Sequence, residues 1–106
     1  MNNLLKKEYI TLIANEAINK LNKFKGTTLS LDRILLKQYK DEPMVQVEII
    51  NTKAKRAEAF VISDSFFDAS KTDQHDAVAG VDKISDELTK LALRLAYRIW
   101  RYSSIK

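Results

Sequence analysis

Polar residues that metal sites and acid–base pairs commonly use gather between positions 68 and 82. His75 is the single histidine of the 106-residue chain, and four aspartates lie within seven positions of it. An imidazole beside carboxylates is typical of metal ligation or proton transfer. Asp73, His75 and Asp76 also stand where a helix is expected to begin, and short polar residues are common there as helix caps. We therefore interpret them as capping residues and predict no metal site.

Other patterns of catalytic chemistry are missing from the sequence. The chain has no cysteine, which excludes a disulfide framework, a thiolate metal site and a cysteine nucleophile. The DxDxDG spacing of a calcium loop is absent, and Gly26 and Gly80 lie too far apart to form one phosphate loop. Most reaction classes need a nucleophile, a phosphate loop or a second histidine. The sequence therefore predicts a protein that is not an enzyme and that uses no cofactor.

Charge is the next feature that bears on function. The net charge is +4, with a sequence isoelectric point near 9.3. Residues 1–57 hold eleven Lys/Arg against six Asp/Glu, residues 58–87 hold two against eight, and residues 88–106 hold five with no acid. Such blocks favour electrostatic steering toward a partner or self-association. The plainer interpretation is a solvated surface on which the oppositely charged segments neutralise one another after folding.

Lys53, Lys55 and Arg56 form a basic connection between two expected strands. Grouped cations bind phosphates, so these residues predict a nucleic-acid-binding site as the alternative to a protein-binding role. The expected element order, α-β-β-β-α, is similar to that of double-stranded-RNA-binding domains. Those domains place a lysine cluster at the start of the second helix, where residues 73–76 here read Asp-Gln-His-Asp. Acid at that position argues against their mode of RNA binding.

The C-terminal helix carries more apolar surface than one sheet can bury. Its continuous apolar stripe is expected to face the core and comprises Ala77, Val81, Ile84, Leu88, Leu91, Leu95, Ile99 and Tyr102. Leu93, Tyr97 and Trp100 are also at helical spacing, on roughly the opposite side of the helix. Exposed apolar patches that contain Trp, Tyr and Arg are typical of protein interfaces.

This second strip predicts a partner-binding surface. The predicted site consists of the apolar anchors Leu93, Tyr97 and Trp100 and the polar rim Arg94, Arg98 and Arg101. Two alternatives stay open. In the first, the N-terminal helix packs on the strip and makes it core; in the second, the basic amphipathic segment contacts a lipid surface as a peripheral membrane element.

Five elements must position these residues. Residues 3–24 predict a helix, because one stripe recurs at helical spacing through Ile10, Ile13, Ala14, Ala17, Ile18, Leu21 and Phe24. Alternating apolar residues predict strands within 27–39, 44–50 and 57–67, with a bulge near Asp32 and a turn at 40–43. A long helix is expected from about 73 to 102.

These elements predict one α+β domain over residues 1–106. Its order is α-β-β-β-α, with a three-stranded antiparallel sheet backed by the two helices. We expect a non-catalytic interaction or assembly subunit that forms homo-oligomers or docks on a larger complex through its C-terminal helix. The first residues lack the apolar core of a secretory signal, which favours a cytoplasmic protein. A mature exported fragment without its leader would have the same sequence.

Overall fold

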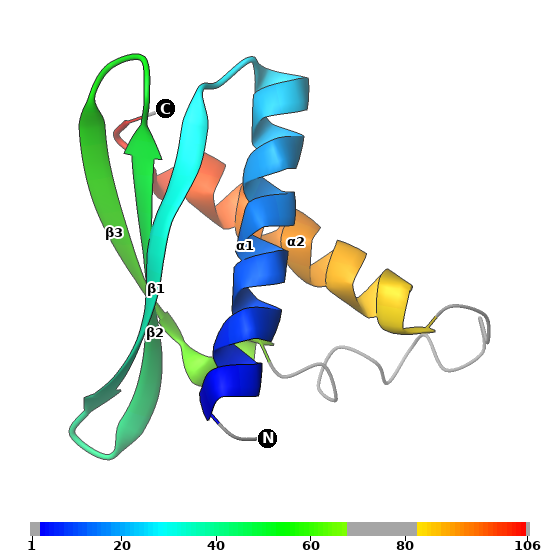
Figure 1. Ribbon diagram of the computed structural model, residues 1–106, viewed down its shortest axis with the longest axis vertical. Helices are drawn as coiled ribbons and strands as arrows, with labels where there is room; N and C mark the ends of the chain where they lie inside the picture. The colour runs from blue at the N-terminus through cyan, green and yellow to red at the C-terminus, as the bar shows by residue number, and fades with distance from the viewer. Residues whose placement is uncertain (1–2, 68–82, 106) are drawn as a thin grey trace.

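The computed structural model describes residues 3–67 and 83–105, and it confirms the predicted order of a helix, three antiparallel strands and a helix (Figure 1). The elements are α1 (Asn3–Lys25), β1 (Leu29–Tyr39), β2 (Glu42–Asn51), β3 (Arg56–Ser63), the 3-10 turn η1 (Asp64–Phe67) and α2 (Lys83–Tyr102). The strand order is β1-β2-β3, so β2 is central. Both helices lie on one side of the sheet, where α2 crosses behind α1 in the view of Figure 1.

The helix α1 buries the predicted apolar stripe as far as Leu21 and then ends in a fixed turn. Its buried residues are Ile10, Ile13, Ala14, Ala17, Ile18 and Leu21. Gly26 follows the helix with φ +69°, a left-handed conformation that glycine adopts without steric cost. The Asn22 side chain accepts the Leu29 N–H and donates to the Leu29 carbonyl, both at 2.9 Å. These bonds set the direction in which β1 leaves the helix.

The sheet follows the predicted alternation, with two corrections at its ends. The pairing register of β1 and β2 shifts between Leu31 and Arg33, which confirms the bulge near Asp32. The predicted turn over residues 40–43 is too long, because Pro43 lies inside β2 and pairs with Gln38. Proline is accommodated there because it stands at the beginning of the strand.

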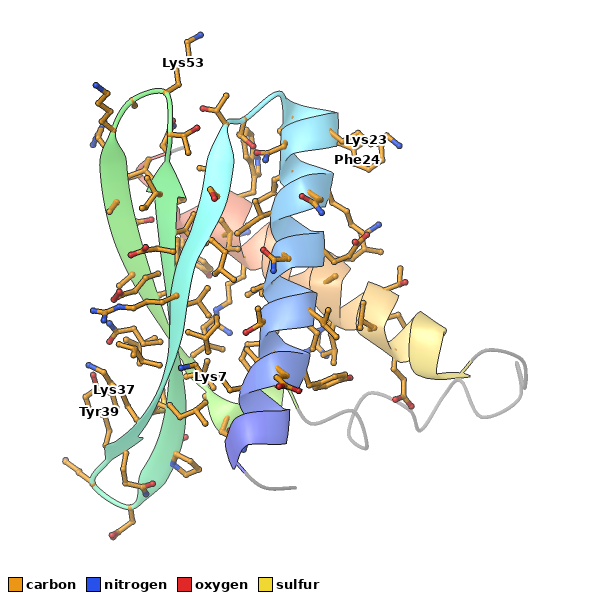
Figure 2. All side chains as sticks on the ribbon, viewed as in Figure 1. Lys7, Lys23, Phe24, Lys37, Tyr39 and Lys53 are labelled. Carbon is orange, nitrogen blue, oxygen red and sulfur yellow. The ribbon has the colours of Figure 1, made fainter. Side chains whose placement is uncertain are left out.

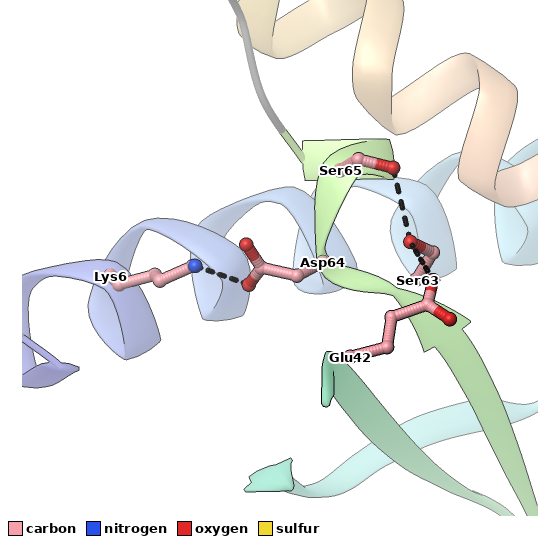
Figure 3. Close-up of polar contacts among 5 residues, drawn as sticks. All are labelled: Lys6, Glu42, Ser63, Asp64 and Ser65. Atoms are coloured by element: carbon pink, nitrogen blue, oxygen red, sulfur yellow. Dashed lines mark hydrogen bonds and ion pairs between the residues drawn. The ribbon is translucent and has the colours of Figure 1, made fainter. Parts of the chain in front are cut away.

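The third strand is shorter than predicted, ending at Ser63 instead of Phe67. Polar contacts turn the chain away from the sheet at this point (Figure 3). Asp64 pairs with Lys6 of α1, while the Ser63 hydroxyl donates to Glu42 at 3.3 Å and lies 3.0 Å from the Ser65 hydroxyl. The turn η1 then carries Phe67 into the core, at 5% exposure. The predicted strand extended to Phe67 because aromatic residues such as Phe66 and Phe67 favour β-strands.

The helix α2 buries Leu91, Leu95 and Ile99 as predicted. Tyr102 was predicted in the same stripe and is instead 66% exposed. The reason is that the chain leaves the helix after Tyr102 and places Ile105 in the core. The predicted helix start, with its capping residues and residues 68–82, lies outside the described residues. No helix in the described part of the chain is long and apolar enough to cross a membrane.

Asn51 ties the C-terminal tail to the sheet. This side chain is 8% exposed and donates to the Ile105 carbonyl at 2.6 Å. Its oxygen accepts from the Thr28 hydroxyl at 2.9 Å and from the backbone N–H groups of Lys53 and Ala54 at 3.1 and 3.0 Å. One amide therefore joins the turn after α1, the β2–β3 turn and the chain end, and it fixes where α2 must finish.

Candidate protein-docking face

The strip opposite the buried stripe of α2 contains two of the most exposed large apolar residues of the described chain. Leu93 is 51% exposed and Tyr97 is 61% exposed. Trp100, the third predicted anchor, is half-buried against the core. The Lys25 ammonium lies 5.1 Å from the centre of its indole ring. The helix α1 thus covers part of Trp100 and leaves Leu93 and Tyr97 open to solvent.

A groove of about 400 Å³ runs between the last turn of α1 and the solvent side of α2. It is lined by Lys20, Leu21, Phe24, Lys25, Leu93, Ala96, Tyr97 and Trp100. Phe24 was predicted to lie in the core and is instead 70% exposed. It stands in the last turn of α1 and projects from the helix in Figure 2, so it forms a wall of this groove.

A second groove of about 610 Å³ lies on the other side of the same two residues. It is lined by Phe66, Leu93, Arg94, Tyr97, Arg98 and Tyr102. Leu93 and Tyr97 belong to both linings, so they form a ridge between two hollows. We call this surface the aromatic face and define it as Phe24, Phe66, Leu93, Tyr97, Trp100 and Tyr102.

Cations border the aromatic face on both sides. The guanidinium carbons of Arg94 and Arg98 lie 5.1 and 5.6 Å from the centre of the Phe66 ring. Arg101 donates a hydrogen bond of 2.9 Å to the Tyr97 hydroxyl oxygen. This bond is the main reason why the pKa of the Arg101 guanidinium is raised. We call these side chains the cationic rim and define it as Lys20, Lys25, Arg94, Arg98 and Arg101.

The charges of the cationic rim are largely uncompensated within the described residues. Lys20 pairs with Glu16 at 3.3 Å, one turn earlier in α1. Lys25, Arg94, Arg98 and Arg101 contact aromatic rings or a tyrosine hydroxyl, and none of these four has a carboxylate partner in the part of the chain described. A guanidinium over a ring keeps its N–H groups available to an acceptor. The face can therefore bury apolar side chains and pair with carboxylates at the same time.

The other predicted site, Lys53, Lys55 and Arg56, lies at the turn between β2 and β3. All three residues are exposed, and Lys55 has φ +55°. Figure 2 shows Lys53 projecting outward from the hairpin end. Because Asn51 holds the backbone of this turn, the three cations are carried on a fixed loop.

The structure explains why the pKa values of Glu48 and Tyr9 are shifted. Arg33 hydrogen-bonds Glu48 across the open face of the sheet and lowers the pKa of that carboxyl, with a smaller contribution from Gln46. Burial raises the pKa of Tyr9, and Glu87 adds to the effect. Among the residues that the structure describes, no group of three His, Asp or Glu side chains is placed to hold a metal ion. The cluster around His75 lies outside the described residues.

Sequence reasoning missed five members of the site: Phe24, Phe66, Tyr102, Lys20 and Lys25. Phe66 was assigned to a strand and Tyr102 to the buried stripe of α2. The other three belong to α1, whose crossing with α2 no pattern in the sequence fixes. The one available signal was the pair Phe66–Phe67, because adjacent aromatic side chains cannot both point into one core.

Comparisons with protein-family models, with curated proteins and with solved structures find no match to this chain. The function proposed below therefore depends on the aromatic face and the cationic rim themselves.

Proposed function

We propose that this chain is a non-catalytic interaction subunit that docks on another protein, or on copies of itself, through the aromatic face. The observation that carries the proposal is the ridge of Leu93 and Tyr97, which stays more than half exposed between two apolar hollows. Burying apolar surface yields about 25 cal/mol per Å². Tyr, Trp and Arg are also the residues that contribute most to binding at interfaces.

The fold itself does not need this ridge. The opposite side of α2 contributes Leu91, Leu95 and Ile99 to the core, at 0–1% exposure. Leu93 and Tyr97 are therefore surplus to folding, and contiguous exposed apolar area is typical of a surface that meets a partner.

The proposal is tested by the size of the species that contains the chain in a native cell extract. We expect the wild type to elute well above its 12.2 kDa mass in size-exclusion chromatography, and the double variant Leu93→Ala/Tyr97→Ala to elute as a monomer. The matched control is Tyr39→Ala/Val61→Ala, which removes similar side chains from the sheet at 48% and 43% exposure. This control should elute as the wild type does. A wild type that elutes as a monomer contradicts the proposal.

A nucleic-acid-binding accessory role is the second candidate. The observation that favours it is the placement of Lys53, Lys55 and Arg56 on one exposed, fixed turn. Three phosphate contacts predict that the logarithm of the binding constant falls with the logarithm of salt at a slope near −3. Titration of a generic DNA duplex with the wild type and with the triple alanine variant measures this slope. A flat titration at low salt excludes this role.

A further inference from the structure

We infer that the occupant of the aromatic face is an amphipathic helix of a different protein, with one apolar stripe and carboxylates along both of its flanks. The inference rests on the proposed function and specifies its partner. It follows from the order of side chains across the surface: lysines of α1, a groove, the Leu93–Tyr97 ridge, a second groove, and the arginines of α2. Both borders of the apolar area carry the same sign of charge.

The charge of the rim argues against a second copy of this chain in the same position. A symmetric dimer places a patch against itself. The Arg94, Arg98 and Arg101 side chains of one copy would then lie against the aromatic face and cationic rim of the other. Residues 88–106 hold five basic residues and no acid, and Glu16, the carboxylate at the α1 border, already pairs with Lys20. Like charges brought together at an interface oppose binding, whereas carboxylates there would be steered in and held.

The shape of the surface favours a helix. Leu93 and Tyr97 are four residues apart on α2, so they form one of the inclined ridges along which helices pack. A helix that straddles this ridge places one row of its apolar side chains in each groove. From Leu93 to Trp100 the face extends about 10 Å along α2, which corresponds to about two turns of a partner helix.

The packing of α2 disfavours a lipid surface as the occupant. A helix that lies on a membrane buries a broad apolar side in the bilayer. The broad apolar side of α2, which includes Leu91, Leu95 and Ile99, is buried in the core instead. Arg94 and Arg98 are also held against the Phe66 ring instead of extending toward headgroups.

The experiment uses Trp100 as an intrinsic probe, because it is the single tryptophan of the chain and lines the first groove. Its fluorescence is titrated with three designed helical peptides of about 18 residues, long enough to form a helix on the face. The first has a leucine stripe flanked by glutamates, and the second has the same stripe flanked by lysines. The third has the composition of the first in scrambled order. Anionic phospholipid vesicles form a fourth titrant.

We expect the glutamate-flanked peptide to bind at least tenfold more tightly than either other peptide or the vesicles at about 50 mM salt, and to weaken as salt rises. The variant Arg94→Glu/Arg98→Glu should weaken it at least tenfold. The matched control is Lys37→Glu/Lys40→Glu, which makes the same charge change on exposed residues of the β1–β2 hairpin. It should bind as the wild type does.

Every other result overturns the inference, and these results differ in what they mean for the proposed function. Equal binding of the two stripe peptides means that the face docks apolar helices without a preference for acid, so the proposed function stands without this partner. Self-association that Leu93→Ala/Tyr97→Ala abolishes has the same meaning, with a second copy as the occupant. Tighter binding to vesicles replaces the protein partner with a membrane surface. No binding by any titrant overturns the inference, and extract chromatography then decides the proposed function separately.

Discussion

Two leucines on α2, two positions apart, should differ sharply in what they contribute to stability. Leu95 is 0% exposed within the core, and Leu93 is 51% exposed on the aromatic face. Leu95→Ala removes buried methyl groups and leaves a cavity, which costs about 2–5 kcal/mol of unfolding free energy. Leu93→Ala removes the same atoms from a site that is half in water. Its cost should be about 1 kcal/mol or less, and the higher helix propensity of alanine offsets part of it.

Urea denaturation followed by circular dichroism measures both values on purified protein. For a chain of this size the difference corresponds to a melting temperature about 5–20 °C lower for Leu95→Ala than for Leu93→Ala. The measurement is repeated at two protein concentrations, because a contribution of Leu93 through self-association would grow with concentration. If Leu93→Ala costs as much as Leu95→Ala at every concentration, Leu93 packs within its own chain and the aromatic face is core.

Three further variants test the structural account. Asn51→Ala removes four hydrogen bonds that join Ile105 and two turns. Each is worth about 1 kcal/mol net, so the variant should lower the unfolding free energy by about 4 kcal/mol in urea denaturation; a loss near zero would show that the tail does not depend on Asn51. Gly26→Ala should cost about 1 kcal/mol, since φ is +69° and no atom lies within 4 Å of an added Cβ, and a loss above about 3 kcal/mol would mean a clash. Arg33→Ala should raise the pKa of Glu48, as followed by carboxyl NMR titration, because the Arg33 hydrogen bond is the first cause that lowers it. Because the pKa of Glu48 is lowered in the folded state, its contact with Arg33 stabilises the fold at pH values above the pKa of the unfolded carboxyl. The greater unfolding free energy of the wild type over Arg33→Ala should therefore disappear as the pH falls through the folded pKa of Glu48; a difference that persists at lower pH would contradict this.

The elements of the fold were predictable because their patterns are local. The α1 stripe, the alternation of β2 and the bulge near Asp32 each follow from residues a few positions apart, and all three are present. The errors lie at the ends of elements, where distant contacts decide. β3 ends at Ser63 because Lys6 and Glu42, distant in sequence, make polar contacts that turn the chain.

The candidate site was predictable only as one side of a helix. Spacing alone places Leu93 and Tyr97 opposite the buried stripe, and both side chains are open to solvent. Spacing does not give the angle at which α1 crosses α2, so the coverage of Trp100 by Lys25 and the exposure of Phe24 had no local signal. The return of Ile105 to the core, which leaves Tyr102 outside, depends on Asn51, 54 positions away.

The central claim is that a protein partner covers the aromatic face, and site-specific photocrosslinking in the native cell tests it most directly. A photoreactive phenylalanine analogue replaces Tyr97 in one variant and Tyr39 in the other, two exposed tyrosines of which the first lies in α2 and the second at the end of β1. We predict a discrete adduct of one protein from position 97, lost when Arg94→Glu/Arg98→Glu is added, and no such adduct from position 39. Failure to form an adduct at position 97, or the same products from both positions, would contradict the claim.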